Sequence, residues 1–374
     1  MPVVLAMTHA PAVAQTVPRL EVELSVLASE NPLLLTGDDT GAVQTDLSAR
    51  PGVRITTPTG SSFDLGAVIT NRNYSRRFGN FVVGRVDAAA DYRDSERLSI
   101  GAEASFSRDL AVDLLTGSVE AAVDPTSVRT GYGGRLSLAW RPDEYTSVLP
   151  AIGIDRFSFD RTNLLGDTRS IDASLAVRRR TGPRTTLGAR AGAIFSDTAR
   201  LSSTDTRFLY ATIDRRLGAS WRLTGELGLE RAGARTETLL GATVAQPPRT
   251  RVSGRAELCR DRPDPVICLT AALNSEVSGL GGLQRRGVLT ASFDQRLDER
   301  TTLGVDAEYQ RTVMQADVFP DFDAVRAVAT LERSVTREWR IGATLQYLRR
   351  RLVDGSRIGS GFAGLRLTYA PALR

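Results

Sequence analysis

The chain has 374 residues, of which 41% are hydrophobic, and its formal net charge is +5. Its mean hydropathy is -0.15, and no apolar run approaches the roughly twenty residues of a spanning helix, which excludes helical membrane spans. All 48 basic residues are arginine, and they are interleaved with acids along the chain rather than gathered in one patch, so we expect no nucleic-acid partner.

The N-terminus resembles the end of a secretory signal, with a small-residue cleavage site at Ala12, Val13 and Ala14. We therefore expect residues 1–14 to be a truncated signal peptide and residues 15–374 to form the mature domain. The positively charged start of a signal is missing, so a disordered N-terminal tail is the alternative.

From the mature start onward, segments of about ten residues with alternating apolar and polar side chains recur about eighteen times. Trp339, Ile341 and Ala343, for example, alternate with Arg340 and Gly342. The strands are expected near 19–29, 43–57, 62–75, 80–93, 97–111, 130–141, 145–160, 168–181, 185–199, 204–217, 220–236, 249–261, 265–276, 284–297, 301–314, 322–336, 339–353 and 359–370. This pattern predicts an all-β fold, a single transmembrane antiparallel up-and-down β-barrel of about 18 strands, with 16 as the alternative.

Short polar turns and longer irregular connections alternate between these strands. The longer connections are residues 30–41, 112–129, 162–167, 238–248, 278–283 and 315–321. In an outer-membrane barrel the short turns face the periplasm and the long loops face outward. An even strand number then places both termini on the periplasmic side.

The polar face of the strands carries both signs of charge, which suits a water-filled lumen. The expected lumen-lining residues are Arg50, Arg54, Arg85, Arg135, Arg178, Arg222, Arg255, Arg326, Arg340, Asp46, Asp64, Asp87, Asp172, Asp214, Glu226, Asp306 and Glu332. They either select solutes or merely solvate and rigidify the wall. The connection that includes residues 117–124 is long enough to fold inward as a constriction.

Aromatic residues on the apolar face are expected to form girdles at the two membrane interfaces. Trp140, Trp221, Trp339 and Tyr369 lie beside short turns, whereas Tyr309, Tyr347 and Phe106 lie nearer the long loops. Chance placement of a few aromatics is the alternative.

Cys259 and Cys268 flank a short turn, and alternation places both on the polar face. In a symmetric hairpin they sit opposite each other at a separation that suits a disulfide, which an oxidising compartment favours. A bulge that displaces the two thiols is the alternative.

The sequence offers few residues of the types that hydrolytic or metal-dependent catalysis uses. The one histidine, His9, lies in the segment expected to be removed, so a histidine-based triad is excluded. The two cysteines lack companion ligands at a metal spacing, and the loop acids match no calcium loop. We expect no enzymatic activity, no metal and no cofactor.

The beginning of the barrel resembles the beta-barrel porin 2 family of outer-membrane proteins. The resemblance rests on Glu30 and Asn31, where the family usually has Asp-Asn, and on Pro51 and Gly52 within the second strand. It implies an outer-membrane barrel associated with the export of exopolysaccharide in Gram-negative bacteria. The chain ends five residues after Tyr369, whereas many barrels end on an aromatic residue that the insertion machinery reads.

Two functions remain open. The first is a porin-like channel for saccharide or other polar cargo, diffusive or within an exopolysaccharide export system. The second is a structural or adhesive barrel whose loops bind a surface polymer or partner. Either one has outer-membrane lipid and the barrel-insertion machinery as partners, and polysaccharide export components join them in the first. Oligomeric state stays open.

Overall fold

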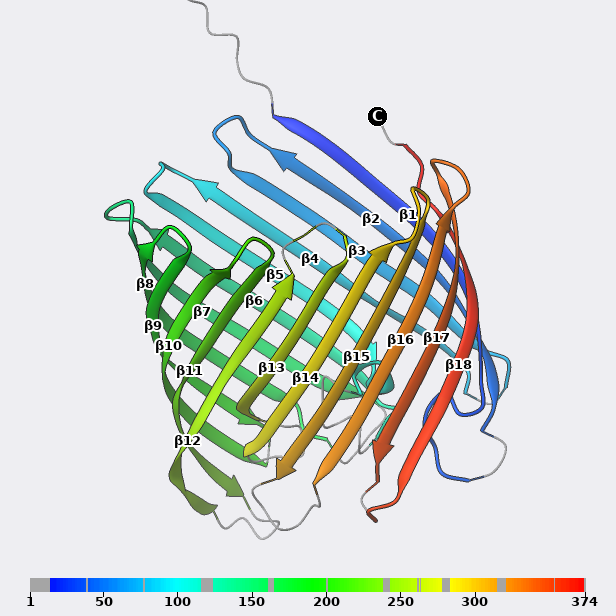
Figure 1. Ribbon diagram of the computed structural model, residues 1–374. Coiled ribbons are helices and arrows are strands. Elements are labelled where there is room, and N and C mark those ends of the chain that lie inside the picture. Colours follow the sequence, from blue (N-terminus) through cyan, green and yellow to red (C-terminus); the bar gives the residue numbers. More distant parts are fainter. Residues whose placement is uncertain are drawn as a thin grey trace, which may run out of the picture.

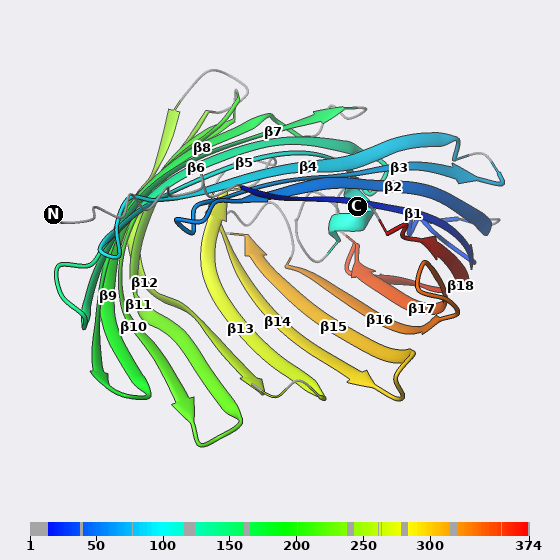
Figure 2. The same ribbon diagram turned by 90° about the horizontal axis from the view of Figure 1, so that it is seen from above.

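A computed structural model describes residues 14–37, 40–76, 78–115, 124–160, 165–199, 201–237, 243–260, 262, 264–277, 283–314, 321–352 and 354–372. These residues form one closed, antiparallel, all-β barrel of 18 strands (Figures 1 and 2). The predicted fold class is confirmed, and the sixteen-strand alternative is wrong. No helix among the described residues has the length and apolar character needed to cross a membrane.

The strands follow the alternating segments of the sequence closely. They are β1 (Gln15–Ser29), β2 (Ala42–Thr56), β3 (Ser62–Tyr74), β4 (Asn80–Arg93), β5 (Leu98–Leu110), β6 (Val128–Trp140), β7 (Thr146–Asp160), β8 (Thr168–Gly182), β9 (Thr185–Thr198), β10 (Ser202–Leu217), β11 (Trp221–Glu237), β12 (Thr243–Arg260), β13 (Val266–Val277), β14 (Leu283–Arg296), β15 (Thr301–Met314), β16 (Phe322–Ser334), β17 (Trp339–Arg351) and β18 (Arg357–Tyr369). A single 3-10 turn, η1 (Ala111–Leu114), follows β5.

Each strand pairs antiparallel with its neighbour in sequence, and β1 pairs with both β2 and β18. The closing ladder runs from Val22 opposite Tyr369 to Ser29 opposite Phe362. One end of the barrel carries the turns between β2 and β3, β4 and β5, and so on, and we call it the short-turn end. The other carries the connections that include residues 30–41 and 111–127, and we call it the loop end.

Strand β12 begins six residues earlier than predicted. The sequence assigns Thr243–Pro248 to a connection because proline lacks the N–H that a ladder needs, yet β12 begins at Thr243. The pairing with β11 shifts here, from Ala232 opposite Arg249 to Ala234 opposite Gln246. The shift leaves Pro247 and Pro248 without a partner in the ladder with β11. The lack of a backbone N–H on these two prolines therefore costs no ladder hydrogen bond.

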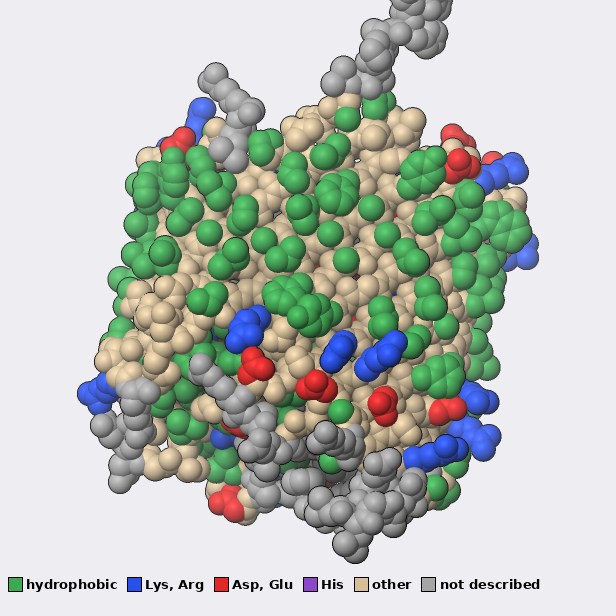
Figure 3. All heavy atoms as spheres, turned by 180° about the vertical axis from the view of Figure 1, so that it is seen from behind, with side chains coloured by type: hydrophobic (Ala, Val, Ile, Leu, Met, Phe, Trp, Pro, Cys, Tyr) green, Lys and Arg blue, Asp and Glu red, His purple; other side chains and the backbone are tan. Residues whose placement is uncertain are grey.

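The outer face of the barrel is apolar over most of its height. Large side chains stand exposed on it, such as Leu227 at 65% and Leu365 at 70%. The space-filling view shows apolar side chains spread over this face, with arginines and acids gathered in a band towards the loop end (Figure 3). Such a face is what a lipid-exposed strand presents.

The main buried apolar cluster lies inside the barrel at the loop end. Leu33 and Leu34 from the connection after β1 pack with Ala111, Val112 and Leu115, and Figure 2 shows η1 within the barrel outline. Buried side chains of eight strands complete the cluster: Ala42, Tyr74, Phe81, Val83, Leu110, Val128, Ala324, Leu348 and Phe362. The carbonyl of Leu34 also accepts a hydrogen bond from Arg350 Nη2 at 2.9 Å. The described parts of two connections, around Leu34 and η1, therefore fold inward and pack against the wall.

The ladder between β12 and β13 is the shortest in the barrel, with six residue pairs from Cys259–Cys268 to Gly254–Leu273. Beyond it, the Glu230 carboxylate of β11 accepts hydrogen bonds from Ser253 Oγ at 2.5 Å and from the Ser275 backbone N at 3.1 Å. Glu230 is only 3% exposed. A side chain thus replaces the missing strand pairing at this seam.

Candidate functional site

The candidate site is the inner surface of the barrel. The strand registers place the charged residues that the sequence assigns to the lumen on the face opposite the apolar exterior. These residues are Arg50, Arg54, Arg85, Arg135, Arg178, Arg222, Arg255, Arg326, Arg340, Asp46, Asp64, Asp87, Asp172, Asp214, Glu226, Asp306 and Glu332.

A continuous ladder of ion pairs crosses the closure between the first and last strands. Glu21 on β1 binds both Arg50 on β2 and Arg340 on β17, so it reaches past β18 on the concave side. Arg340 also binds Glu332 at 3.1 Å, and Glu332 binds Arg366 at 2.9 Å. The ladder joins β1, β2, β16, β17 and β18 through side chains as well as backbone.

A second group fixes η1 to the wall. The Arg72 guanidinium on β3 binds Asp46 on β2 at 3.1 Å and Asp113 in η1 at 2.8 Å. Arg72 is 12% exposed, and its planar fork serves both carboxylates at once. The inward position of η1 is therefore set by charge as well as by the apolar cluster.

The wall from β4 to β8 holds an acid-rich recess of about 460 Å³. Its charged residues are Arg85, Asp87, Glu103, Arg135, Asp155 and Asp172. Arg85 binds Asp87 at 2.6 Å, and Arg135 lies 3.7 Å from Asp172. Four acids against two arginines give the recess a surplus of negative charge.

Two glycines let the acids of this recess lie flat on the sheet. A Cβ on Gly153 would come within 2.2 Å of Asp172 Oδ1, and one on Gly133 within 2.9 Å of Asp155 Oδ1. Any larger residue at these positions would displace the carboxylates. The recess therefore depends on the absence of side chains at its floor.

The wall from β9 to β12 pairs its charges more evenly. Arg190 binds Glu226 at 3.2 Å, and Arg222 binds Asp214 at 2.5 Å. Arg178 and Arg255 line a smaller recess with Asp214 and Glu226. On β15 and β16, Arg326 stands directly opposite Glu308, and Asp306 stands one step further along the same inner face.

Several charged residues that pair with, or lie beside, the predicted lumen residues were not predicted from the sequence. Glu21, Glu103, Asp155, Arg190 and Arg366 follow from the same alternation that identified their neighbours, so the signal was present. Asp113 had no such signal, because it lies in a connection whose path no periodicity describes. The residues 116–123 of that connection, which hold most of the predicted constriction, lie outside the described residues.

The inner charges are solvated although they face the inside of the molecule. The side chains of Arg85 and Asp87 are 62% and 49% exposed, and that of Arg54 is 58% exposed. A packed interior would bury such groups, and unpaired burial of charge costs several kcal/mol on the order-of-magnitude scale. These charged groups are therefore open to solvent inside the barrel.

The predicted girdle residues stand on the outer face. Trp140, Trp221 and Trp339 lie at strand ends beside short turns and are exposed, and the ring of Trp339 lies 4.8 Å from that of Tyr369. Tyr309, Tyr347 and Phe106 are exposed further towards the loop end. Tyr132, which was not among the predicted girdle residues, is also exposed, and its ring lies 5.3 Å from that of Phe106.

The sulfur atoms of Cys259 and Cys268 are bonded to each other at 2.07 Å. The two residues are directly opposite in the ladder between β12 and β13. Among the described residues, no three histidine, cysteine or acidic side chains gather as a metal site.

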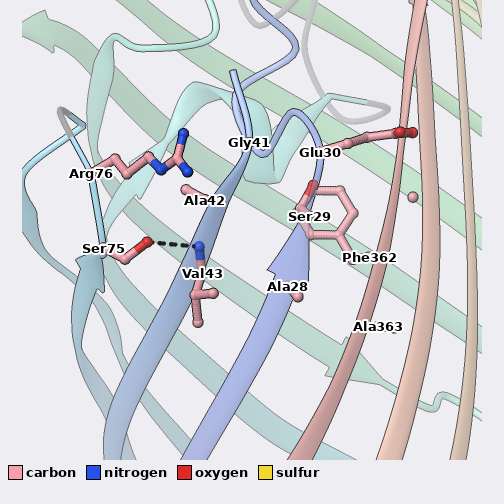
Figure 4. A pocket seen from close by; sticks show the side chains of 11 residues that line it. Ala28, Ser29, Glu30, Gly41, Ala42, Val43, Ser75, Arg76, Phe362 and Ala363 are labelled. Atoms are coloured by element: carbon pink, nitrogen blue, oxygen red, sulfur yellow. Dashed lines mark hydrogen bonds between the residues drawn. The ribbon is translucent and has the colours of Figure 1, made fainter. Parts of the chain in front are cut away.

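A separate recess of about 630 Å³ lies at the loop end of the closure, between β18, β1, β2 and the start of the next turn (Figure 4). Small residues such as Ala28 and Gly41 line it, with Glu30 and Arg76 at two sides. Ser75 Oγ accepts a hydrogen bond from the Val43 backbone N at 3.0 Å and ties the turn to β2. We assign this recess no function.

No family model and no curated protein matches the chain. Solved structures with similar folds include Pseudomonas aeruginosa OccK2 (OpdF) in complex with glucuronate, with 12% identity, 95% of this chain and 98% of that chain covered, and a TM-score of 0.47. The outer membrane protein opdK from Pseudomonas aeruginosa matches with 11% identity, 96% and 98% coverage, and a TM-score of 0.48. A BenF-like porin from Pseudomonas fluorescens Pf-5 matches with 8% identity, 95% and 99% coverage, and a TM-score of 0.46.

Proposed function

We propose that the protein is a porin-like channel of the Gram-negative outer membrane that passes small polar solutes. The observation that carries the proposal is the solvation of two-signed charge inside a closed barrel whose exterior is apolar. Eighteen strands enclose more space than their own side chains fill. An apolar belt with aromatic residues near its edges suits a bilayer on the outside.

The inner charges suggest which solutes pass. Arginine forks on several walls donate hydrogen bonds to hydroxyl, carboxylate or phosphate oxygens, and the recess between β4 and β8 presents carboxylates to hydroxyl groups and cations. A solute with hydroxyl groups, such as a sugar or sugar acid, finds partners on both sides. The expected link with exopolysaccharide export rests on the sequence resemblance alone and is not part of this proposal.

The folded-in connections narrow the path at the loop end. The cluster around Leu34, Val112 and Leu115 occupies part of the mouth, and Asp113 is held there by Arg72. We therefore expect a cut-off by size, with monosaccharides and disaccharides admitted before longer oligosaccharides.

Liposome swelling tests the proposal directly. Vesicles that contain the purified protein should swell in isotonic monosaccharide, more slowly in disaccharide, and not in a large dextran. Protein-free vesicles and vesicles with heat-unfolded protein are the controls. A correctly folded barrel that admits no monosaccharide and stays silent in planar bilayers would overturn the channel and favour the adhesive alternative.

A further inference from the structure

Charge is distributed unevenly around the short-turn end of the barrel. Residues 178–187, at the turn between β8 and β9, hold four arginines and no acid, and residues 214–223, at the turn between β10 and β11, hold three arginines and one acid. The two turns are neighbours, because β8 to β11 lie side by side in the sheet (Figure 1). We call these seven residues the arginine rim: Arg178, Arg179, Arg180, Arg184, Arg215, Arg216 and Arg222.

The other six short turns together carry no positive surplus. In stretches of matching length they hold eleven arginines and thirteen acids, at residues 54–64, 91–100, 138–147, 258–267, 294–303 and 332–341. The two stretches at β14 to β17 alone hold five arginines and five acids. The arginine rim is therefore a local feature and not part of a generally basic end.

The protein itself balances little of the charge of the arginine rim. Asp214, the one acid, binds Arg222 at 2.5 Å. Among the described residues, no ion pair joins the other six arginines to an acid, and all six are exposed. Arg216 is directly opposite Arg222 in the ladder between β10 and β11, and like charges in that position are destabilising. An anion bound at the rim would offset this repulsion.

A hollow of about 970 Å³ beside the arginine rim shows the same imbalance. The turns between β4 and β5 and between β6 and β7 line it with three arginines and three acids: Arg93, Arg97, Arg141, Glu96, Asp143 and Glu144. Arg178 and Arg180 of the rim line the hollow in addition, and Asp214 in its lining is already bound to Arg222. The charge of the rim is therefore the part that stays unmatched.

The arginine rim projects to both sides of the barrel wall, because successive side chains of a strand alternate. Its inward members are Arg178, Arg180, Arg216 and Arg222, and its outward members are Arg179 and Arg215. A lipid on the outside reaches only the outward arginines, and a solute in the lumen reaches only the inward ones. An elongated molecule that lies across the strand ends reaches both.

We infer that the arginine rim binds an acidic, extended segment of a periplasmic protein across the ends of β8 to β11. Arginine forks pair with carboxylates, as Arg190 does with Glu226 inside this barrel. Neighbouring strands lie about 4.8 Å apart, so four strand ends span about 15 Å, the length of about five extended residues. The inference goes beyond the proposed channel and shares with it only the outer-membrane placement, which directs the short turns to the periplasm.

The test measures binding of a fluorescein-labelled oligoglutamate peptide to the full-length barrel in zwitterionic detergent, by fluorescence anisotropy at low salt. The peptide should bind the wild type, and high salt should release it because exposed charges are screened. The variant Arg179→Gln/Arg180→Gln/Arg184→Gln/Arg215→Gln should bind at least about tenfold more weakly, because it loses several charge-assisted hydrogen bonds. A wild type that binds no peptide, or a variant that binds it equally well, would overturn the inference.

The matched control removes the same charge from the same end of the barrel. The variant Arg296→Gln/Arg300→Gln/Arg333→Gln/Arg337→Gln replaces four exposed arginines whose turns contain as many acids as arginines. It should bind the peptide like the wild type, and compact migration in SDS gels verifies that both variants fold. Equal weakening in the two variants would show that the peptide responds to net charge alone, which contradicts a site at the rim.

Two further arms separate the peptide from other anions. The wild type in nanodiscs of anionic phospholipid should still bind the peptide, and free glutamate should displace it poorly because one residue covers only part of the rim. Loss of binding in the nanodiscs would assign the rim to lipid headgroups, and complete displacement by glutamate would assign it to a solute, so either result overturns the inference. Peptide binding in detergent requires no conductance, so a silent channel and an empty rim are distinguishable.

Discussion

At the scale of single residues, the barrel is organised by charges that face each other across strands. Glu21 is the clearest case, because one carboxylate binds arginines on β2 and β17 and so spans the closure. Alternation assigns such residues to the inner face. It does not say that strands 1 and 17 approach each other, because that follows only from closure of the sheet.

Substitution Glu21→Gln should weaken the closure. In this variant Arg50 still binds Glu23 at 3.0 Å, and Arg340 still binds Glu332 at 3.1 Å. The free energy of unfolding should therefore fall only partly, by about 1 kcal/mol. The temperature at which the barrel loses its compact migration in SDS gels should fall by a few degrees. Asp160→Asn, on the outer face, is the control, and an unchanged transition for Glu21→Gln would show that backbone pairing alone holds the closure.

Asp143 in the turn between β6 and β7 predicts a pH dependence. The backbone N–H groups of Tyr145 and Thr146 donate to its carboxylate, both at 2.7 Å, and they hold the pKa of Asp143 below its ordinary value. A lowered pKa in the folded state stabilises the turn above the unfolded pKa, near 4, and the effect is lost as pH falls through the lower folded value.

Asp143→Ala should therefore lower the SDS-gel transition temperature at pH 7, and the difference from wild type should shrink only in strongly acidic buffer. A difference that stays constant down to the lowest pH would contradict this assignment.

At the scale of elements, two segments depart from the simple hairpin repeat. The seam between β12 and β13 has six residue pairs and a disulfide next to its turn, and the connection after β5 folds inward as η1. The alternating pattern is regular through both strands of the seam, so the length of its ladder could not be predicted. The curvature of the whole sheet decides at which residue two neighbouring strands stop pairing.

The double variant Cys259→Ser/Cys268→Ser should destabilise this seam more than an equal change elsewhere, because few backbone hydrogen bonds remain to hold it. A loss of about 2 kcal/mol is expected for a short closed loop. Hydrogen exchange in β12 and β13 should rise while β3 and β4 stay protected. Uniform exchange across the barrel would mean that the disulfide has no local role.

Replacing residues 112–126 with a short Asn-Gly turn should widen the mouth. The change removes the η1 contribution to the inner cluster and the Asp113 partner of Arg72. Single-channel conductance in planar bilayers should increase. Unchanged conductance in a variant that keeps the SDS resistance of the wild type would count against a constricting role.

At the scale of the whole molecule, the closed sheet separates two environments. Apolar residues of alternating segments face outward, and charges of both signs face the interior, where side chains such as those of Arg85 and Asp87 are exposed. The distribution of the inner charges around the wall then sets the field that a solute meets. The recess between β4 and β8 is acidic, whereas the wall from β9 to β12 is balanced.

Neutralising the acidic recess should alter ion preference. The double variant Asp155→Asn/Asp172→Asn removes two of its four acids, so the reversal potential in a KCl gradient should move towards anions. Asp160→Asn lies on the same strand as Asp155 but faces outward, and it should leave the reversal potential unchanged. Equal shifts in both variants would mean that the recess does not control permeation.

The alternating pattern predicted about eighteen strands, with sixteen as the alternative, the two faces and the inner position of most charges, because side chains of a strand alternate with period two regardless of context. The closed fold alone shows the strand number, which charges meet, where the wall is acidic, which described loop segments lie inside and where β12 parts from β13. These features depend on the curvature of a closed sheet, which brings together residues such as Glu21 and Arg340 that no local pattern relates.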